Sequence, residues 1–575
     1  MKNKEQDCEI KNKNYFILTS IIVLLFILMM TIVNLNYYVR KNKEDKGAET
    51  ENALRMPEEK QVVRNLSCLI IKGKDNNQSN EIVEGSLEKA KIGYISKSKF
   101  EDITDEELSL AKIIIINGSE FNNIGNVKLI FEYLKKGKHI IFTSIPDVHY
   151  IEASGLEEVM GIRKITQSKY QEGIKFLSGF MLGGLLELPD FSYNAPEIQL
   201  LSTAKAYVTG SKDAAVVWRN TYNNSEIYVV NGPFFKTNAG YGILSAIMAQ
   251  IHQDYIYPVI NAKAFTYTGL PYASYENTDQ LEGIYSRNAM QLQQDILIPD
   301  VLSVNKSRNL IPSGFLINSF HKDYDGEINK YNEKQINNYE KEFYKLGGEV
   351  GMVYTGDLEK DSKIYHYLFN KNSKSILLNN KNLENLNELI VKEQFNSIES
   401  IFGPWTIKKR CFGYLTKNTV YIPFTLDGIV KTDLQKIEFY SAITAFGVSV
   451  QNLNLDQIIF PQEDKDNWMY VLREYVKFID SYRNKFQMIE ARNITDTAQA
   501  VKKFENNSPT IEYFNNKIKI EFKEWYGESY FILRTNKEID SITEGTIEKI
   551  EEGAYLVTAK NKEVDINLRQ IDKYE

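Results

Sequence analysis

Short apolar segments alternate with helical patterns between residues 255 and 505, and this alternation restricts the fold more than any other feature. The apolar segments are Tyr255–Tyr267, Gly314–Ser319, Glu349–Tyr354, Ser375–Asn379 and Val420–Leu426. Helical patterns such as Asn332–Leu346 and Asp466–Asn484 stand between them. Repeated strand–helix units predict an α/β domain in which parallel strands form a barrel. Residues that act on a ligand are then expected at the carboxyl ends of the strands.

Residues 62–250 predict a separate α/β domain. Ser67–Lys72, Ile113–Asn117 and His139–Thr143 are apolar enough for buried strands. Val127–Lys136 has helical spacing and is followed by Gly137, a typical residue at the end of a helix. Short links between strand and helix favour a parallel sheet.

Residues 511–575 have a different pattern, in which polar and apolar residues alternate in short segments. This pattern predicts a small β-sandwich domain at the end of the chain.

Residues 15–37 are expected to form one transmembrane anchor. Tyr15–Val33 contains 19 residues without a charge, and a helix of that length spans about 28 Å, close to the apolar thickness of a bilayer. The tail of residues 1–14 is expected in the cytoplasm, and the charged segment 38–61 is expected to be a stalk. The membrane is thus a predicted partner, and the bulk of the chain is expected outside the cytoplasm.

Composition excludes some kinds of site. The net charge is -7, and no segment has the dense basic pattern that a nucleic-acid partner requires. The three cysteines, Cys8, Cys68 and Cys411, form no C-x-x-C pair. The five histidines form no close pair, so zinc-ligand spacing is missing. We therefore predict no metal and no other cofactor.

Part of the first domain resembles a known fold. The segment "LIFEYLKKGKHIIFTSIPD…GLEEVMGI" is similar to the flavodoxin-like, amidotransferase-like domains that accompany many bacterial glycosidases. Amidotransferases carry a nucleophilic cysteine on a sharp turn after a strand, whereas this strand ends in Thr143–Pro146. The resemblance therefore implies a structural or interaction domain, and Ser144 is a poor candidate for a nucleophile.

The second domain resembles a family of carbohydrate enzymes. The stretch "YIYPVI", the stretch "KAFTYTGLPYASYEN" and Gly347–Glu349 follow the order of elements in the NodB-homology polysaccharide deacetylases, carbohydrate esterase family four. The order is closer to a bacterial group of membrane-anchored deacetylase-like proteins that resembles the deacetylase of Pel-type exopolysaccharide systems. The resemblance implies an irregular (β/α) barrel.

The metal-binding motifs of that family are degenerate in this chain. The family uses an Asp-Asp pair, and the pair falls on Tyr267 and Thr268 or on Thr268 and Gly269. Two family histidines fall on Val353 and Asp357. Since Asp357 is the one residue here with a metal-binding side chain, the resemblance implies a deacetylase-like domain without its metal site.

Two other chemistries stay open. Asp357 and Asp427 both follow predicted barrel strands, and two carboxylates are enough for glycoside hydrolysis. A loop cap at Asp357 and a tight Asp-Gly turn at Asp427 are the ordinary structural explanations. Aromatic residues near the same strand ends could stack on sugar rings or simply pack the core: Tyr267, Tyr272, Tyr275, Tyr354 and Trp405.

The sequence favours a membrane-anchored, catalytically inactive polysaccharide-deacetylase-like protein. Its expected role is in cell-envelope or Pel-like exopolysaccharide synthesis or export, through glycan binding or scaffolding. The expected partners are an envelope polysaccharide and proteins of exopolysaccharide synthesis or export. An active carbohydrate hydrolase and a protein-interaction scaffold without glycan contact are the alternatives.

Overall fold

A computed structural model of the 575-residue chain describes residues 67–569, except 74–76, 119–125, 127, 273–275, 317–329, 384–385 and 406–410. The predicted tail, anchor and stalk, and Tyr275, lie outside the described residues. Within the described part of the chain, no helix combines the length and the apolar character needed to cross a membrane. Residues 62–575 form one compact unit, to which the following description refers.

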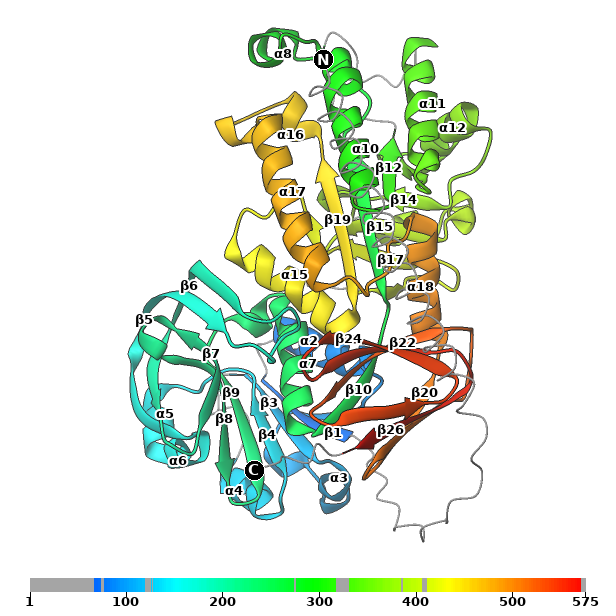
Figure 1. The fold of residues 1–575 in the computed structure, drawn as a ribbon. Helices are drawn as coiled ribbons and strands as arrows, with labels where there is room; N and C mark the ends of the chain where they lie inside the picture. Colours follow the sequence, from blue (N-terminus) through cyan, green and yellow to red (C-terminus); the bar gives the residue numbers. More distant parts are fainter. Residues whose placement is uncertain are drawn as a thin grey trace, which may run out of the picture. The chain divides into compact units, whose positions relative to one another are not determined.

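The first domain is built on a nine-stranded sheet with strand order β2–β1–β3–β4–β9–β8–β7–β5–β6 (Figure 1). Its parallel part contains β2 (Gly93–Lys97), β1 (Ser67–Lys72), β3 (Ile113–Asn117), β4 (His139–Phe142) and β9 (Ser225–Val230). Its antiparallel part adds β8 (Ala215–Tyr222), β7 (Lys205–Gly210), β5 (Ile162–Phe176) and β6 (Leu186–Leu200). The apolar residues of β1, β3 and β4 are fully buried, which explains why these strands were predictable.

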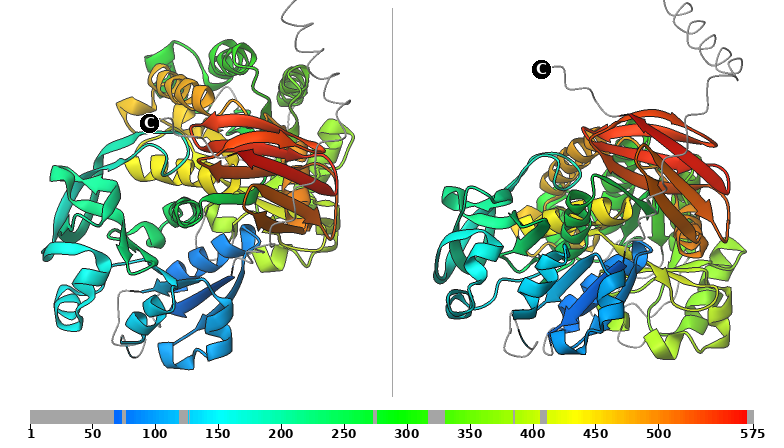
Figure 2. Two further views of the ribbon diagram at one scale, coloured as in Figure 1. Left: turned by 60° about the horizontal axis from the view of Figure 1, so that its bottom comes forward. Right: turned by 90° about the horizontal axis from the view of Figure 1, so that it is seen from below.

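Helices cover this sheet. They are α2 (Asn77–Lys89), α3 (Asp105–Leu110), α4 (Lys128–Lys135), α5 (Val148–Ser154), α6 (Leu156–Met160) and α7 (Ala239–Ile251). Helix α7 packs against α2 and also against α15 (Asp433–Phe446) of the next domain (Figures 1 and 2). The two helices come close because Gly242 has no side chain, and its N–H donates a 2.6 Å hydrogen bond to Ser441 Oγ. Helix α7 therefore joins the two domains.

The second domain is a curled sheet of parallel strands with one short antiparallel edge strand. Its order is β16–β17–β15–β14–β13–β12–β11–β19–β18. The strands are β11 (Ala262–Thr268), β12 (Pro312–Leu316), β13 (Val350–Val353), β14 (Ser375–Leu377), β15 (Ser400–Pro404), β16 (Gly413–Tyr414), β17 (Val420–Phe424), β18 (Leu426–Asp427) and β19 (Val448–Asn454). Strand β17 pairs with β15, and its continuation β18 pairs with β19. The segment 420–427 is therefore bonded to both sides of the curled sheet.

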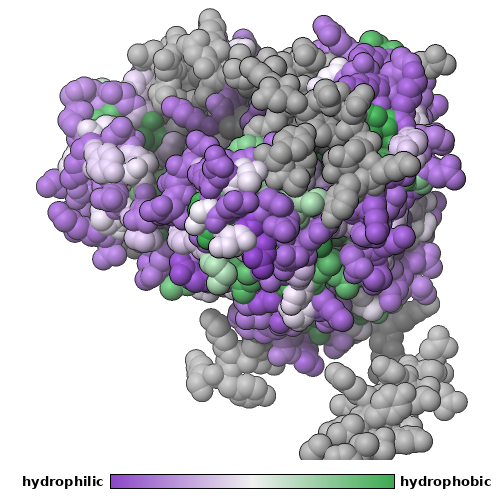
Figure 3. Space-filling view, turned by 90° about the horizontal axis from the view of Figure 1, so that it is seen from above, coloured by the Kyte–Doolittle hydropathy of each residue, from purple (hydrophilic) through white to green (hydrophobic). Residues whose placement is uncertain are grey.

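Helices flank the curled sheet: α8 (Thr278–Tyr285), α9 (Ala289–Leu292), α10 (Ile298–Ser307), α11 (Lys330–Lys345), α12 (Leu358–Phe369), α13 (Asn380–Leu383), α14 (Leu386–Leu389), α15, α16 (Asp456–Ile459), α17 (Trp468–Lys485) and α18 (Ile494–Asn506). Strands β12 and β19 point toward the end of the molecule that carries α8, α11 and α16 (Figure 1). Hydrophilic residues cover most of the coloured surface at that end, with hydrophobic residues in small groups (Figure 3).

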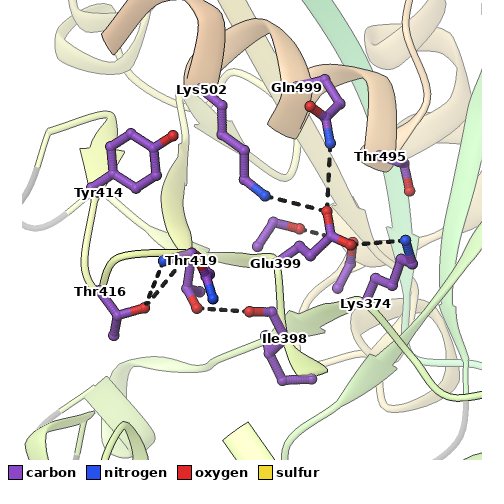
Figure 4. Close-up of polar contacts among 12 residues, drawn as sticks. Lys374, Ile398, Glu399, Tyr414, Thr416, Thr419, Thr495, Gln499 and Lys502 are labelled. Atoms are coloured by element: carbon purple, nitrogen blue, oxygen red, sulfur yellow. Dashed lines mark hydrogen bonds and ion pairs between the residues drawn. The ribbon is translucent and has the colours of Figure 1, made fainter. Parts of the chain in front are cut away.

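The opposite, amino end of the curled sheet is fixed by ion pairs. Glu399, just before β15, contacts Lys374 at 2.8 Å and Lys502 of α18 at 3.2 Å (Figure 4). The pair of lysines lowers the pKa of Glu399, so the carboxylate stays charged. This cluster joins α18 to the start of the sheet.

Two four-stranded antiparallel sheets form the β-sandwich, with orders β10–β22–β25–β24 and β20–β21–β26–β23. The strands are β10 (Asp254–Val259), β20 (Pro509–Phe514), β21 (Lys517–Phe522), β22 (Ser529–Thr535), β23 (Glu538–Ile542), β24 (Gly545–Glu551), β25 (Ala554–Ala559) and β26 (Glu563–Arg569). Its core includes Ile256, Ile520, Phe531 and Val557. The sandwich thus takes one strand from a distant part of the chain.

This arrangement differs from the expectation of one strand over Tyr255–Tyr267. The backbone at Asn261 has φ +54°, a left-handed conformation that interrupts an extended strand. Residues before it pair with β22 of the sandwich, and residues after it form β11 of the curled sheet. The domain predicted over 511–575 therefore also needs residues 254–259.

Candidate functional site

The carboxyl ends of three neighbouring strands meet at one place on the curled sheet. Thr268 at the end of β11 lies in register with Asn454 at the end of β19. On the other side of β19, Asp427 of β18 lies in register with Asn452. Because all three strands are parallel, their terminal side chains gather at the same edge. We call Thr268, Asp427, Asn452, Asn454 and the following Asp456 the carboxylate edge.

Asn452 holds one of the two acids in place. Its side chain is buried, and its Oδ1 accepts a 3.1 Å hydrogen bond from Thr266 Oγ1. Its Nδ2 therefore faces the other way and donates a 2.7 Å hydrogen bond to Asp427 Oδ1. Since one amide group makes both bonds, the orientation of the Asp427 carboxylate is fixed from inside the sheet.

Asp427 is exposed, and its surroundings alter its protonation. The protein around it displaces water and raises the pKa of this carboxyl, and the hydrogen bond from Asn452 opposes that rise. The Gly428 N–H donates a 2.7 Å hydrogen bond to the carbonyl of Asn452, so the Asp-Gly turn is itself tied to β19. Asp427 is thus both a turn residue and an accessible acid.

Asp456 is the second acid of this edge. Its N–H donates a 3.0 Å hydrogen bond to Asn454 Oδ1, and the neighbouring Leu455 N–H donates one to the carbonyl of Thr268. Its Oδ1 atom is buried and finds no hydrogen-bond partner among the described residues. Burial raises the pKa of Asp456 to about 6, because the charged form is poorly solvated there.

Gly269 makes room for Asp456. Its backbone has φ +76°, and a Cβ at this position would lie 2.5 Å from Asp456 Oδ1 and 2.7 Å from the Asp456 nitrogen. Both the conformation and the space require glycine. The family resemblance aligns Gly269 with a metal-binding aspartate. In this chain, the absence of a side chain at Gly269 leaves the space that Asp456 occupies.

The side chain of Asp357 caps a helix. It is the N-cap of α12, where its Oδ1 accepts hydrogen bonds from the N–H groups of Glu359 and Lys360, both at 3.1 Å. A side chain used in this way stabilises the start of a helix. The structure supports the helix-cap explanation of Asp357. Val353, the other aligned histidine position, is buried in β13.

Several rings expected at a sugar-binding surface lie in the core instead. Tyr267 is fully buried, and its hydroxyl contacts Tyr475 and Asn305. Tyr272 and Tyr354 are also buried. These three rings are covered by neighbouring side chains, so their faces are not open for stacking on a sugar.

Trp405 is partly buried between the first two domains. Its ring stacks on Tyr241 of α7 with centroids 5.9 Å apart, and it also packs against Phe412 and Phe446. Its packing against α7 joins the first two domains.

Sequence reasoning missed Asn452, Asn454 and Asp456. The signal was present in "VSVQNLNLD", where these three residues recur at every second position after an apolar strand. Such spacing places Asn452 and Asn454 on one face of β19, and Asp456 follows at the start of α16. Within the described residues, no group of three or more His, Cys, Asp or Glu side chains is placed to hold a metal ion.

Residues 392–556 match a family model described as "Uncharacterised protein conserved in bacteria (DUF2194)". This range includes Asp427, Asn452 and Asp456. No curated protein matches the chain.

Some solved structures resemble part of the chain. An exo-β-1,4-mannosidase from Opitutaceae bacterium strain TAV5 has 13% identity and a TM-score of 0.23, over 30% of this chain and 31% of the mannosidase. A ThuA-like protein from Bacteroides uniformis has 11% identity and a TM-score of 0.25, over 35% of this chain and 96% of that one. A glutamine amidotransferase from Thermotoga maritima has 12% identity and a TM-score of 0.21, over 28% and 74%.

Proposed function

We propose that this protein hydrolyses glycosidic bonds of a cell-envelope polysaccharide, with Asp456 and Asp427 as its two acids. The observation that carries the proposal is the environment of Asp456, whose buried Oδ1 has no hydrogen-bond partner among the described residues and whose pKa is raised to about 6. A carboxyl group of this kind is still half protonated at about pH 6, where an ordinary aspartic acid is almost fully ionised, and a raised pKa of this sort suits the general acid of a glycosidase.

The two acids differ in a way that suits the two roles. The pKa of Asp427 is also raised, but Asp427 is exposed and accepts a hydrogen bond from Asn452, which favours its ionised form. Asp456 lacks such a donor at Oδ1. We therefore assign Asp456 as the acid that protonates the leaving oxygen. Asp427 is the ionised partner, either as base or as nucleophile.

Asp456 and Asp427 take the place of Asp357 and Asp427, the two acids that the sequence indicates for a hydrolase. The carboxylate edge also takes the place of the binding groove of Tyr267, Tyr272 and Tyr354, since those rings are buried. The residues at the aligned metal positions, Thr268 and Gly269, do not supply the carboxylates of a deacetylase metal site. We also propose that the curled sheet is related to the barrel of the polysaccharide deacetylases, without their metal site.

The location at the envelope is part of the same proposal. It rests on the apolar segment within residues 15–37, which would anchor the chain, and on the resemblance to exopolysaccharide deacetylases. We propose that the described domains act outside the cytoplasm on a polysaccharide, beside proteins that synthesise or export it.

The test uses the full chain and measures new reducing ends. Acetylated and deacetylated β-linked hexosamine oligomers serve as substrates, and released acetate is measured in parallel with Zn²⁺, Co²⁺ or Ni²⁺ supplied. We expect new reducing ends that disappear in Asp456→Asn and Asp427→Asn, while Asp357→Asn keeps the activity. Acetate release without chain cleavage would instead identify a deacetylase. If neither new reducing ends nor acetate are formed, the result would support an inactive protein that binds a glycan or acts as a scaffold.

A further inference from the structure

A large polar cavity is lined by residues other than those of the carboxylate edge. Its volume is about 870 Å³, within the range of pockets that bind small molecules. One wall is the face of β7, β8 and β9 that carries Lys205, Arg219 and Glu226. The other walls are the end of α7, strand β22 with Arg534, and the sandwich loops that carry Asn536 and Gly553. The cavity is at the amino end of β4 and β9, since His139 and Glu226 are near the starts of those strands.

Glu226 organises the first wall. Its carboxylate accepts hydrogen bonds from Arg219 and from the Tyr228 hydroxyl, both at 3.0 Å. Its own N–H donates a 3.1 Å hydrogen bond to His139 Nδ1. Because Nδ1 accepts, the neutral ring carries its proton on Nε2, and burial lowers the pKa of His139 further. This wall is a set of fixed polar groups in which the charges of Arg219 and Glu226 cancel.

The cation of the opposite wall, Arg534, is hydrogen-bonded within the protein. Arg534 is 6% exposed, and its guanidinium donates hydrogen bonds to the carbonyls of Gly179 and Phe180. Gln250 also donates to the Gly179 carbonyl, at 3.3 Å. Arg534 therefore fixes the loop that contains Gly179 and Phe180, and its guanidinium is not free to bind an anion.

The remaining lining is rich in uncharged donors and acceptors. It includes the hydroxyls of Ser178 and Thr221 and the amides of Asn224, Gln253 and Asn536. Lys205 lies over the Tyr207 ring at 5.2 Å. Glu552, the other carboxylate of the lining, is paired with Lys549 at 2.6 Å.

A ligand for this cavity should therefore be rich in hydrogen-bonding groups and carry little charge. An anion would find both arginines already paired or bonded, which leaves Lys205, over the Tyr207 ring, as the remaining lysine or arginine of the lining. An apolar molecule would leave the amides and hydroxyls without partners. We propose that this cavity binds a neutral oligosaccharide, at a site separate from the carboxylate edge. The inference stands without the proposed hydrolysis, since it uses none of the same residues.

Binding is tested by calorimetry on the full chain with tetramers of β-1,4-linked glucose, galactose and N-acetylglucosamine. Thr221→Trp should block the cavity, because Thr221 is exposed and lines it. Gln253→Ala combined with Asn224→Ala should weaken binding at least fivefold. Gln199→Ala is the matched control, since Gln199 is also exposed but is not part of the lining.

We expect at least one tetramer to bind the native chain. The Thr221→Trp variant should no longer bind it. The Asp427→Asn, Asp456→Asn double variant should bind it as tightly as the native chain does. That last result separates this site from the proposed catalytic one. The inference is overturned if none of the three tetramers binds, if binding survives Thr221→Trp, or if a galacturonic acid tetramer binds more tightly in a Thr221→Trp-sensitive way.

Discussion

The carboxylate of Asp456 lies where a side chain at Gly269 would have to be. A Cβ on Gly269 would be 2.5 Å from Asp456 Oδ1, far inside normal contact distance. Gly269 follows β11 and Asp456 begins α16, yet each determines what the other position can hold. The carboxylate edge is therefore a packed arrangement of the end of β11 against the start of α16.

Gly269→Ala should destabilise the protein more than a similar change elsewhere. A left-handed alanine costs about 1–2 kcal/mol at any site, and here the new methyl group would also overlap Asp456, for a further 1–3 kcal/mol or so. Gly347→Ala is the matched control, because Gly347 has φ +78° and nothing within 4 Å of its Cβ position. Urea unfolding of both variants measures the difference. Equal losses of stability would contradict the packing described here.

Asp456 should make the folded state less stable as the pH rises. Its folded pKa of about 6 is above its unfolded value, so the native state holds the proton longer. Stability should therefore fall between about pH 4 and pH 6, by about 1–3 kcal/mol. Asp456→Asn should remove this contribution, and denaturant midpoints across that pH range report it. An unchanged slope in the variant would show that Asp456 titrates normally.

Asn452 is expected to act as a positioning residue for Asp427. Asn452→Leu removes the 2.7 Å hydrogen bond to Asp427 Oδ1 but keeps a side chain of similar size. A hydrogen bond to a charged group contributes roughly 1.5–3 kcal/mol, so the acid limb of the pH–rate profile should move up by about 1–2 pH units. A loss of rate with an unmoved limb would indicate a purely structural role.

Strand β10 should depend on a partly buried ion pair. Asp254 Oδ2 lies 2.8 Å from Lys537, and Asp254 Oδ1 accepts a hydrogen bond from Thr535. Asp254→Ala leaves the lysine unpaired and should destabilise the protein by about 3 kcal/mol. Lys549→Ala breaks the exposed pair with Glu552 and should change stability by less than about 1 kcal/mol. Thermal unfolding compares the two, and equal effects would show that Asp254 does not hold β10 to the sandwich.

The fold was predictable where burial is continuous along a segment. The strands around Ile113–Asn117 and Val420–Leu426 are buried throughout and almost entirely apolar, and they were found at close to their observed bounds. The long hairpin of β5 and β6 was missed, because many residues on both strands are exposed and polar. The junction at Asn261 was also missed, since a single left-handed residue leaves little trace in composition.

The site was predictable in part. Asp427 was found because it directly follows a buried strand, which is a local feature. Asp456 was not found, because its importance depends on Gly269, almost 190 residues earlier. The expectation about Tyr267 was wrong for a related reason, as its hydroxyl is bonded to Tyr475 and Asn305 from distant helices. Contacts between distant segments decide whether a polar or aromatic residue is free to bind a ligand.

In the proposed reaction, Asp456 protonates the leaving group during glycoside cleavage. The most direct measurement compares the native chain with Asp456→Asn on a sugar oligomer and on a dinitrophenyl glycoside of the same sugar. An alkoxide leaving group needs a proton, whereas dinitrophenolate does not. We predict that Asp456→Asn loses a hundredfold or more on the oligomer and keeps most of its rate on the dinitrophenyl glycoside. Equal losses on both substrates, or no loss on the oligomer, would contradict the assignment of Asp456 as the acid.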